Sequence, residues 1–219
     1  MAAALTWDGT GEKYYHTGVD MGALFIMGSD GTYGDGIAWN GLTKVTDNPQ
    51  GGDRTELWAD NIMYATMNAR ETAGGSISCY TYPTEFEQCL GRVALKAGMY
   101  VGQQPRKKFG FAYRSLVGSD STEEAGEIIH VYYGCSASPS SQDHSTVNDN
   151  PDAIEFSFDF EATPVATTDA KPVATIDFDS RVLASADYAA IKAKIFGSTT
   201  ANATLADPDT LKGLISANQ

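Results

Sequence analysis

The stretch AIEFSFDFEA, residues 153–162, shows the clearest strand pattern in the sequence. Apolar and polar side chains alternate along it, and successive side chains of a β-strand point to opposite faces of the sheet. The apolar set consists of Ile154, Phe156, Phe158 and Phe160. The polar set consists of Glu155, Ser157, Asp159 and Glu161. We therefore predict a half-buried strand with one face in the core and one acidic face.

The same reasoning predicts strands at 74–83, 107–116, 127–135 and 173–180. In the second of these, Phe109, Phe111 and Tyr113 share a face that can pack in one core with the phenylalanines of 153–162. Segment 53–73 reads as two strands joined by a turn at Asp60-Asn61. Strands separated by Gly, Asn, Asp and Pro predict a mainly β protein, an antiparallel β-sandwich or barrel.

Two helical features accompany the strands. TEFEQCLG, residues 84–91, has the T-x-x-E spacing of a capping box at Thr84 and Glu87 and a glycine stop, so we predict a short α-helix flanking the sheets. Phe86 and Leu90 lie four residues apart and should anchor that helix to the sheets. SADYAAIKAKIFG, residues 185–197, predicts an amphipathic helix, and 207–216 a further turn or two. We expect a β-barrel domain at 1–185 and a helical C-terminal extension at 186–219.

Charge and motifs exclude several function classes. The chain has 15 Lys and Arg against 28 Asp and Glu, a formal charge of −13, which argues against a broad nucleic-acid-binding surface. The first residues lack a secretory pattern and no apolar run approaches a membrane span, so we expect synthesis in the cytosol and no membrane association. Without a C-x-x-C, phosphate-loop, H-E-x-x-H or nucleophile-elbow motif, we expect no catalysis and no cofactor or metal.

The order of the segments carries a family resemblance. WDGTGEKYYHTGVDMGALF, YGDGIAWNGLTKV, LWADNIMYA, YTYPTEFEQCLG, GQQPRKKFGFAYRSLVG, IHVYYGCSASPS and STVNDNPDAIEFSFDFEATPV follow one another between residues 7 and about 180. Together they resemble the major tail tube protein of long, non-contractile-tailed bacteriophages. The resemblance implies a structural virion protein with a β-barrel or sandwich and a flanking helix at 84–90, which assembles into stacked hexameric rings. The implied partners are tape-measure, tail tip and terminator proteins, and double-stranded DNA passes through the tube during genome delivery.

This resemblance gives roles to particular residues. Because acidic side chains repel phosphate within a Debye length of about 8 Å, we expect Glu155, Ser157, Asp159 and Glu161 to line the lumen. The polar segments 45–53 and 136–152 should make contacts between rings or neighbouring subunits. The candidate stacking residues are Asp47, Asn48, Gln50, Asp53 and Arg54.

Three other interpretations remain open at this stage. A tube protein of a contractile tail or injection machine would share the same architecture. A carbohydrate- or calcium-binding β-sandwich would use exposed aromatics, for which Trp39, Trp58 and Tyr133 are candidates. A hydrolase with a triad scattered through the sequence is the third, although His130, inside a predicted strand, reads as a hydrogen-bonded structural residue.

Overall fold

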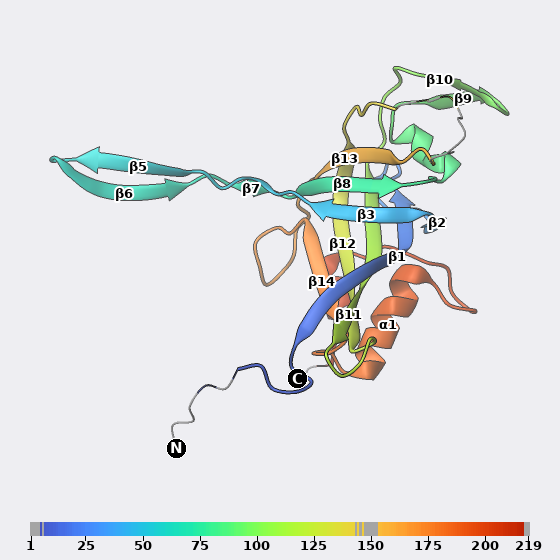
Figure 1. Ribbon diagram of the computed structural model, residues 1–219. Coiled ribbons are helices and arrows are strands. Elements are labelled where there is room, and N and C mark those ends of the chain that lie inside the picture. Colours follow the sequence, from blue (N-terminus) through green and yellow to red (C-terminus); the bar gives the residue numbers. More distant parts are fainter. Residues whose placement is uncertain (1–4, 6, 143, 145, 147–152, 217–219) are drawn as a thin grey trace.

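The computed structural model describes residues 5, 7–142, 144, 146 and 153–216. Its largest element is an antiparallel eight-stranded sheet in the order β2-β1-β11-β12-β13-β8-β3, with β14 also paired to β12 (Figure 1). The strands are β1 (Tyr14–Ile26), β2 (Ile37–Trp39), β3 (Leu42–Asp47), β8 (Gly74–Cys79), β11 (Phe109–Ser119), β12 (Gly126–Ala137), β13 (Phe156–Ala162) and β14 (Thr175–Asp179). The antiparallel, mainly β fold predicted from the sequence is thus confirmed.

Smaller elements surround this sheet. Three two-stranded ribbons pair β4 with β7, β5 with β6 and β9 with β10. Their bounds are β4 (Gln50–Gly51), β5 (Arg54–Ala59), β6 (Ile62–Asn68), β7 (Glu71–Thr72), β9 (Val93–Lys96) and β10 (Met99–Val101). The helices are the 3₁₀ helix η1 (Thr84–Gln88), α1 (Ser185–Phe196) and α2 (Pro208–Lys212). No helix among the described residues has the length and apolar character needed to cross a membrane.

The sheet folds over itself into two layers that enclose an aromatic core. Figure 1 shows β3, β8 and β13 running across the direction of β11 and β12. Between the layers, the ring centroid of Phe86 lies 4.6 Å from that of Trp39, 5.3 Å from Phe109 and 5.2 Å from Phe158. The predicted meeting of the two aromatic strand faces, 107–116 with 153–162, is therefore confirmed.

The expectation of a closed barrel is wrong for the described residues. The paired strands end at β2 on one side and β3 on the other, and no sheet closes on itself. Strand β2 has only three residues, and the chain then turns through Asn40 and Gly41, whose φ of +75° is easily adopted by glycine. The short strand β2 does not pair with β3, so the sheet stays open between these two end strands. The architecture is an open β-sandwich.

The C-terminal helices cover the second face of the central strands. Tyr188, Ile191 and Ile195 of α1 are buried, as their predicted spacing requires, against residues such as Phe25 and Ile129 of the sheet. The buried Tyr133 hydroxyl donates a hydrogen bond to the Ala206 carbonyl oxygen at 2.9 Å. The predicted helices are confirmed, and they complete a second hydrophobic core.

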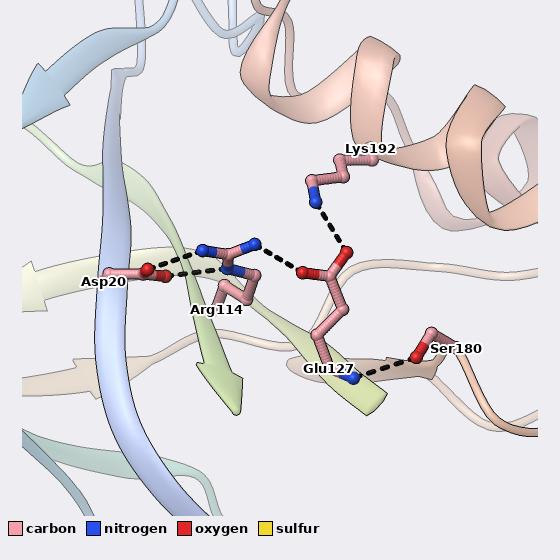
Figure 2. Close-up of polar contacts among 5 residues, drawn as sticks. All are labelled: Asp20, Arg114, Glu127, Ser180 and Lys192. Carbon is pink, nitrogen blue, oxygen red and sulfur yellow. Dashed lines mark hydrogen bonds and ion pairs between the residues drawn. The ribbon is translucent and has the colours of Figure 1, made fainter. Parts of the chain in front are cut away.

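A chain of ion pairs fastens α1 to the sheet (Figure 2). Arg114 of β11 donates to both carboxylate oxygens of Asp20, from Nε at 2.7 Å and from Nη2 at 2.5 Å, and also contacts Glu127. Lys192 of α1 reaches Glu127 Oε1 with its Nζ at 2.5 Å. Burial alone would raise the pKa of Glu127, but Lys192 and Arg114 offset this and hold the pKa below its ordinary value of 4.5.

This lowered pKa predicts an acid-sensitive contact between α1 and the sheet. Because the folded state holds the Glu127 carboxylate ionised, its contribution is present above pH 4.5 and is lost as the pH falls through the lower folded pKa. Glu127→Gln should cost about 1–3 kcal/mol at pH 7. Its free energy of unfolding should also fall less than that of the wild type between pH 6 and pH 3. Urea unfolding at several pH values measures both, with exposed Glu85→Gln as the control.

Candidate assembly surfaces

A long hairpin, which we call the arm (residues 48–73), connects β3 to β8. It consists of the β4–β7 and β5–β6 ribbons, and Figure 1 shows it extending far from the rest of the molecule. At its tip Asp60 and Asn61 have φ of +51° and +61°, as a two-residue hairpin turn requires. The sequence-based prediction of two strands with a turn at Asp60-Asn61 is confirmed.

The arm exposes apolar side chains to an unusual degree. Trp58 is 65 % exposed and Tyr64 is 73 % exposed. The other exposed large apolar residues of the arm are Leu57, Ile62, Met63 and Met67. An isolated two-stranded ribbon is marginally stable in water, and a contiguous exposed apolar surface usually marks an interaction site. The geometry therefore suits a segment that packs against another molecule.

The candidate stacking residues lie at the base of this arm. Asp47 ends β3, Asn48 donates its backbone N–H to the Gly74 carbonyl oxygen at 2.8 Å, and Gln50 pairs with Thr72. The backbone carbonyl oxygen of Asp53 accepts a hydrogen bond from the Ala69 backbone N–H. Arg54 forms an exposed ion pair with Glu56, with 3.7 Å between Nη2 and Oε1. In the predicted loop 45–53, residues 45–47 belong to β3 and residues 50–51 to β4, and the other four residues are outside strands. The candidate stacking residues are therefore polar and lie at the base of the arm, whereas its large exposed apolar residues lie farther out, on β5 and β6.

The predicted acidic face exists and is open to solvent. Glu155, Ser157, Asp159 and Glu161 are exposed, whereas Phe158 and Phe160 between them are buried. The register places Ser157 beside Ser78 and Asp159 beside Ser76, so small hydroxyl side chains continue the polar face onto β8. The Thr43 hydroxyl donates a hydrogen bond to Glu155. This side of β3, β8 and β13 therefore combines carboxylates with small polar groups.

The helix at 84–90 is shorter and differently capped than predicted. It is a 3₁₀ helix that begins after Pro83 without a side-chain cap, so the capping box is wrong. Glu87 instead accepts from the Tyr82 hydroxyl at 3.1 Å and pairs with Arg92, because it points into the protein rather than back along the helix. Phe86 is fully buried and Leu90 packs partly buried on the same core, as expected of anchors.

The cysteines are buried thiols. Cys79, Cys89 and Cys135 are all free and buried. Burial raises the pKa of Cys89 to about 12, with Lys107 opposing the shift.

Two of the three aromatics proposed for a carbohydrate platform are in the core. Trp39 is 2 % exposed and Tyr133 is 1 % exposed, and only Trp58 is accessible, on the arm. Among the described residues, no group of three or more His, Cys, Asp or Glu side chains is placed to hold a metal ion. Residues 143, 145 and 147–152 of the predicted contact loop 136–152 lie outside the described residues, and the first two residues of the loop are the end of β12.

Comparison of the sequence with models of known protein families gave no match, and comparison with curated proteins found no similar sequence.

Proposed function

We propose that this protein is a structural subunit that assembles into stacked hexameric rings and forms the tail tube of a bacteriophage virion. The observation that carries the proposal is the arm, on which Trp58, Ile62 and Tyr64 are largely exposed to solvent. A second copy of the chain is the occupant that the proposal assigns to this surface. The same architecture would serve a contractile tail, and the motif order favours the non-contractile kind.

A second exposed hairpin strengthens the case for repeated assembly. The β9–β10 ribbon exposes Val93, Leu95 and Met99, and Figure 1 shows it on a different side of the molecule from the arm. Rings that stack need two kinds of contact, one around the ring and one along the tube, and each contact joins different surfaces of neighbouring copies. Two separate apolar hairpins supply surfaces for both.

The acidic face gives the tube an inner surface that suits DNA. Exposed carboxylates repeated around a ring repel phosphate and limit adhesion of a passing duplex. Asp159 and Glu161 are two such carboxylates on β13. The proposal therefore retains Glu155, Ser157, Asp159 and Glu161 as the lumen-lining set, with tape-measure, tail tip and terminator proteins as partners.

Negative-stain electron microscopy of the purified protein over a range of concentrations tests the proposal. Rings or tubes of uniform diameter with six-fold averages are the expected result. A protein that stays monomeric at every concentration and salt, including after addition of preformed tube fragments, would argue against self-assembly.

Thiol labelling tests the position of the acidic face. The three native cysteines are buried, so Asp159→Cys introduces a single accessible thiol at an exposed position. A small maleimide should label both free subunits and tubes, whereas a maleimide on a long polymer should label subunits and spare the tube interior. Equal polymer labelling of tubes would place this face outside. Loss of labelling by both reagents would place it in a subunit contact.

A further inference from the structure

Three side chains from neighbouring strands form a hydrogen-bonded relay outside the assembly surfaces. Ser115 lies on β11, His130 on β12 and Asp177 on β14. Ser115 Oγ is 2.8 Å from His130 Nε2, and His130 Nδ1 is 2.7 Å from Asp177 Oδ1. The register pairs His130 with Asp177 directly across the β12–β14 ladder, so the backbone itself sets the second contact.

The order of contacts fixes the protonation pattern of the imidazole. A carboxylate only accepts, so His130 Nδ1 carries the hydrogen that it donates to Asp177. In the neutral ring Nε2 is then the acceptor for the Ser115 hydroxyl. The His130 ring also stacks on Tyr113, with centroids 4.6 Å apart and planes 20° apart, which restricts its rotation. These are the roles of nucleophile, base and orienting carboxylate in a serine hydrolase.

The relay is accessible from solvent. Ser115 is half-buried, the His130 side chain is 20 % exposed, and that of Asp177 is 66 % exposed. None of the three residues is buried, so we expect a small reagent to reach the serine oxygen. An exposed carboxylate weakens the relay relative to a buried one, because water competes for its lone pairs.

We propose that Ser115 is an activated nucleophile that accepts the acyl group of small activated esters, with His130 as the base. In this step Ser115 Oγ forms a bond to the carbonyl carbon while its proton moves to His130 Nε2. The ester bond then breaks, and the alcohol leaves with the proton returned by His130. Water then gives a proton to His130 and attacks the carbonyl carbon of the acyl-serine. The bond from that carbon to Ser115 Oγ breaks, His130 returns the proton to Oγ, and the carboxylic acid leaves.

The expected rate advantage is that of a positioned base. General-base assistance contributes about 10²–10⁴-fold. Because the serine lies on a sheet surface, we expect little selectivity among small acyl groups. This inference is independent of the tube assignment, since it depends only on three side chains within one subunit.

A fluorophosphonate probe and p-nitrophenyl acetate test the assignment, with adducts located by intact-protein and peptide mass spectrometry. The fluorophosphonate should give one adduct at Ser115, with fluoride leaving, and p-nitrophenyl acetate should give an acetyl group on the same residue. His130→Gln keeps a hydrogen-bonding side chain but removes the base, so labelling should fall about 100-fold or more. Asp177→Asn should give an intermediate loss.

Matched variants separate activation from folding. Ser157→Ala removes an exposed serine on β13 and should leave labelling unchanged. Circular dichroism and thermal unfolding establish that His130→Gln is folded, so loss of labelling there reports chemistry. The proposal is overturned if Ser115 stays unmodified, if other serines react as fast, or if folded His130→Gln reacts at the wild-type rate.

Discussion

Replacing residues 51–71 by Asn-Gly should give a folded subunit that forms neither rings nor tubes. Gln50 and Thr72 are register partners, so a two-residue turn can close the hairpin directly after them. The removed segment contributes no residue to either hydrophobic core of the subunit. The thermal midpoint should therefore change little, whereas particles in negative stain and fast-sedimenting species should disappear.

Point variants on the arm refine this test. Trp58→Ser combined with Tyr64→Ser removes two large exposed rings, and central aromatic residues typically cost about 2 kcal/mol or more each when removed from an interface. Together the two losses amount to about 4 kcal/mol, so the concentration needed for assembly should rise by about 700-fold, at 1.4 kcal/mol per tenfold. Val182→Ser, at a 76 % exposed apolar residue outside the arm, is the matched control. If the arm variants assembled at the wild-type concentration, the proposal that the arm lies in a subunit interface would be wrong.

Phe86→Asp should unfold the protein. Phe86 is fully buried, and its ring contacts Trp39, Phe109 and Phe158 in the core between the layers. Truncating such a residue costs about 3–5 kcal/mol, and a buried unpaired carboxylate adds to this. The free energy of unfolding of a typical protein is about 5–15 kcal/mol, so a loss of this size removes most of the stability of the folded state. Circular dichroism and near-ultraviolet spectra should show loss of the native fold at 25 °C.

A control within the same helix separates core packing from local helix propensity. Glu85→Ala changes an exposed neighbour of Phe86, and surface changes usually alter the free energy of unfolding by less than about 0.5 kcal/mol. A cooperative, stable Phe86→Asp variant would show that η1 can detach without loss of the core. That result would contradict the anchor role assigned to Phe86.

The sequence predicted those strands whose two faces differ. In β13 an apolar residue recurs at every second position, because one face meets the core and the other does not. In β11 the aromatic residues also alternate, although its other face is buried in the second core, where the small Ala112 lies. The first strand was not predicted from its own pattern. Its register shifts between Thr17 and Val19 and between Asp20 and Ala23, and Met21 has a φ of +51°. Such bulges reset the alternation, so periodicity fails there although the strand is long.

The candidate sites were harder to predict because they depend on what surrounds each residue. In the arm both faces are exposed. A sequence pattern cannot distinguish an apolar residue that packs within its own subunit from one that remains on the surface and can contact another molecule. Trp39 and Trp58 illustrate this, since the first is buried and the second is exposed. The relay was equally hidden, because Ser115, His130 and Asp177 come from three strands and meet only through strand pairing.

Strand β12 pairs along one edge with β11, while its other edge is shared by β14 at residues 128–132 and by β13 at residues 135–137. Both layers and the helix-covered face thus depend on one strand. Its partners include β14, near the end of the described sheet in sequence, and β11, which in turn pairs with β1 near its beginning. A ribosome must have released residue 179 from its exit tunnel before this sheet can be completed. The sheet is therefore expected to be completed late, only after β14 has been made. Nascent chains on the same messenger RNA would expose the apolar arm before their sheets are complete, so neighbouring chains could aggregate through it. Wide spacing of ribosomes or a chaperone would then increase the yield of folded subunits.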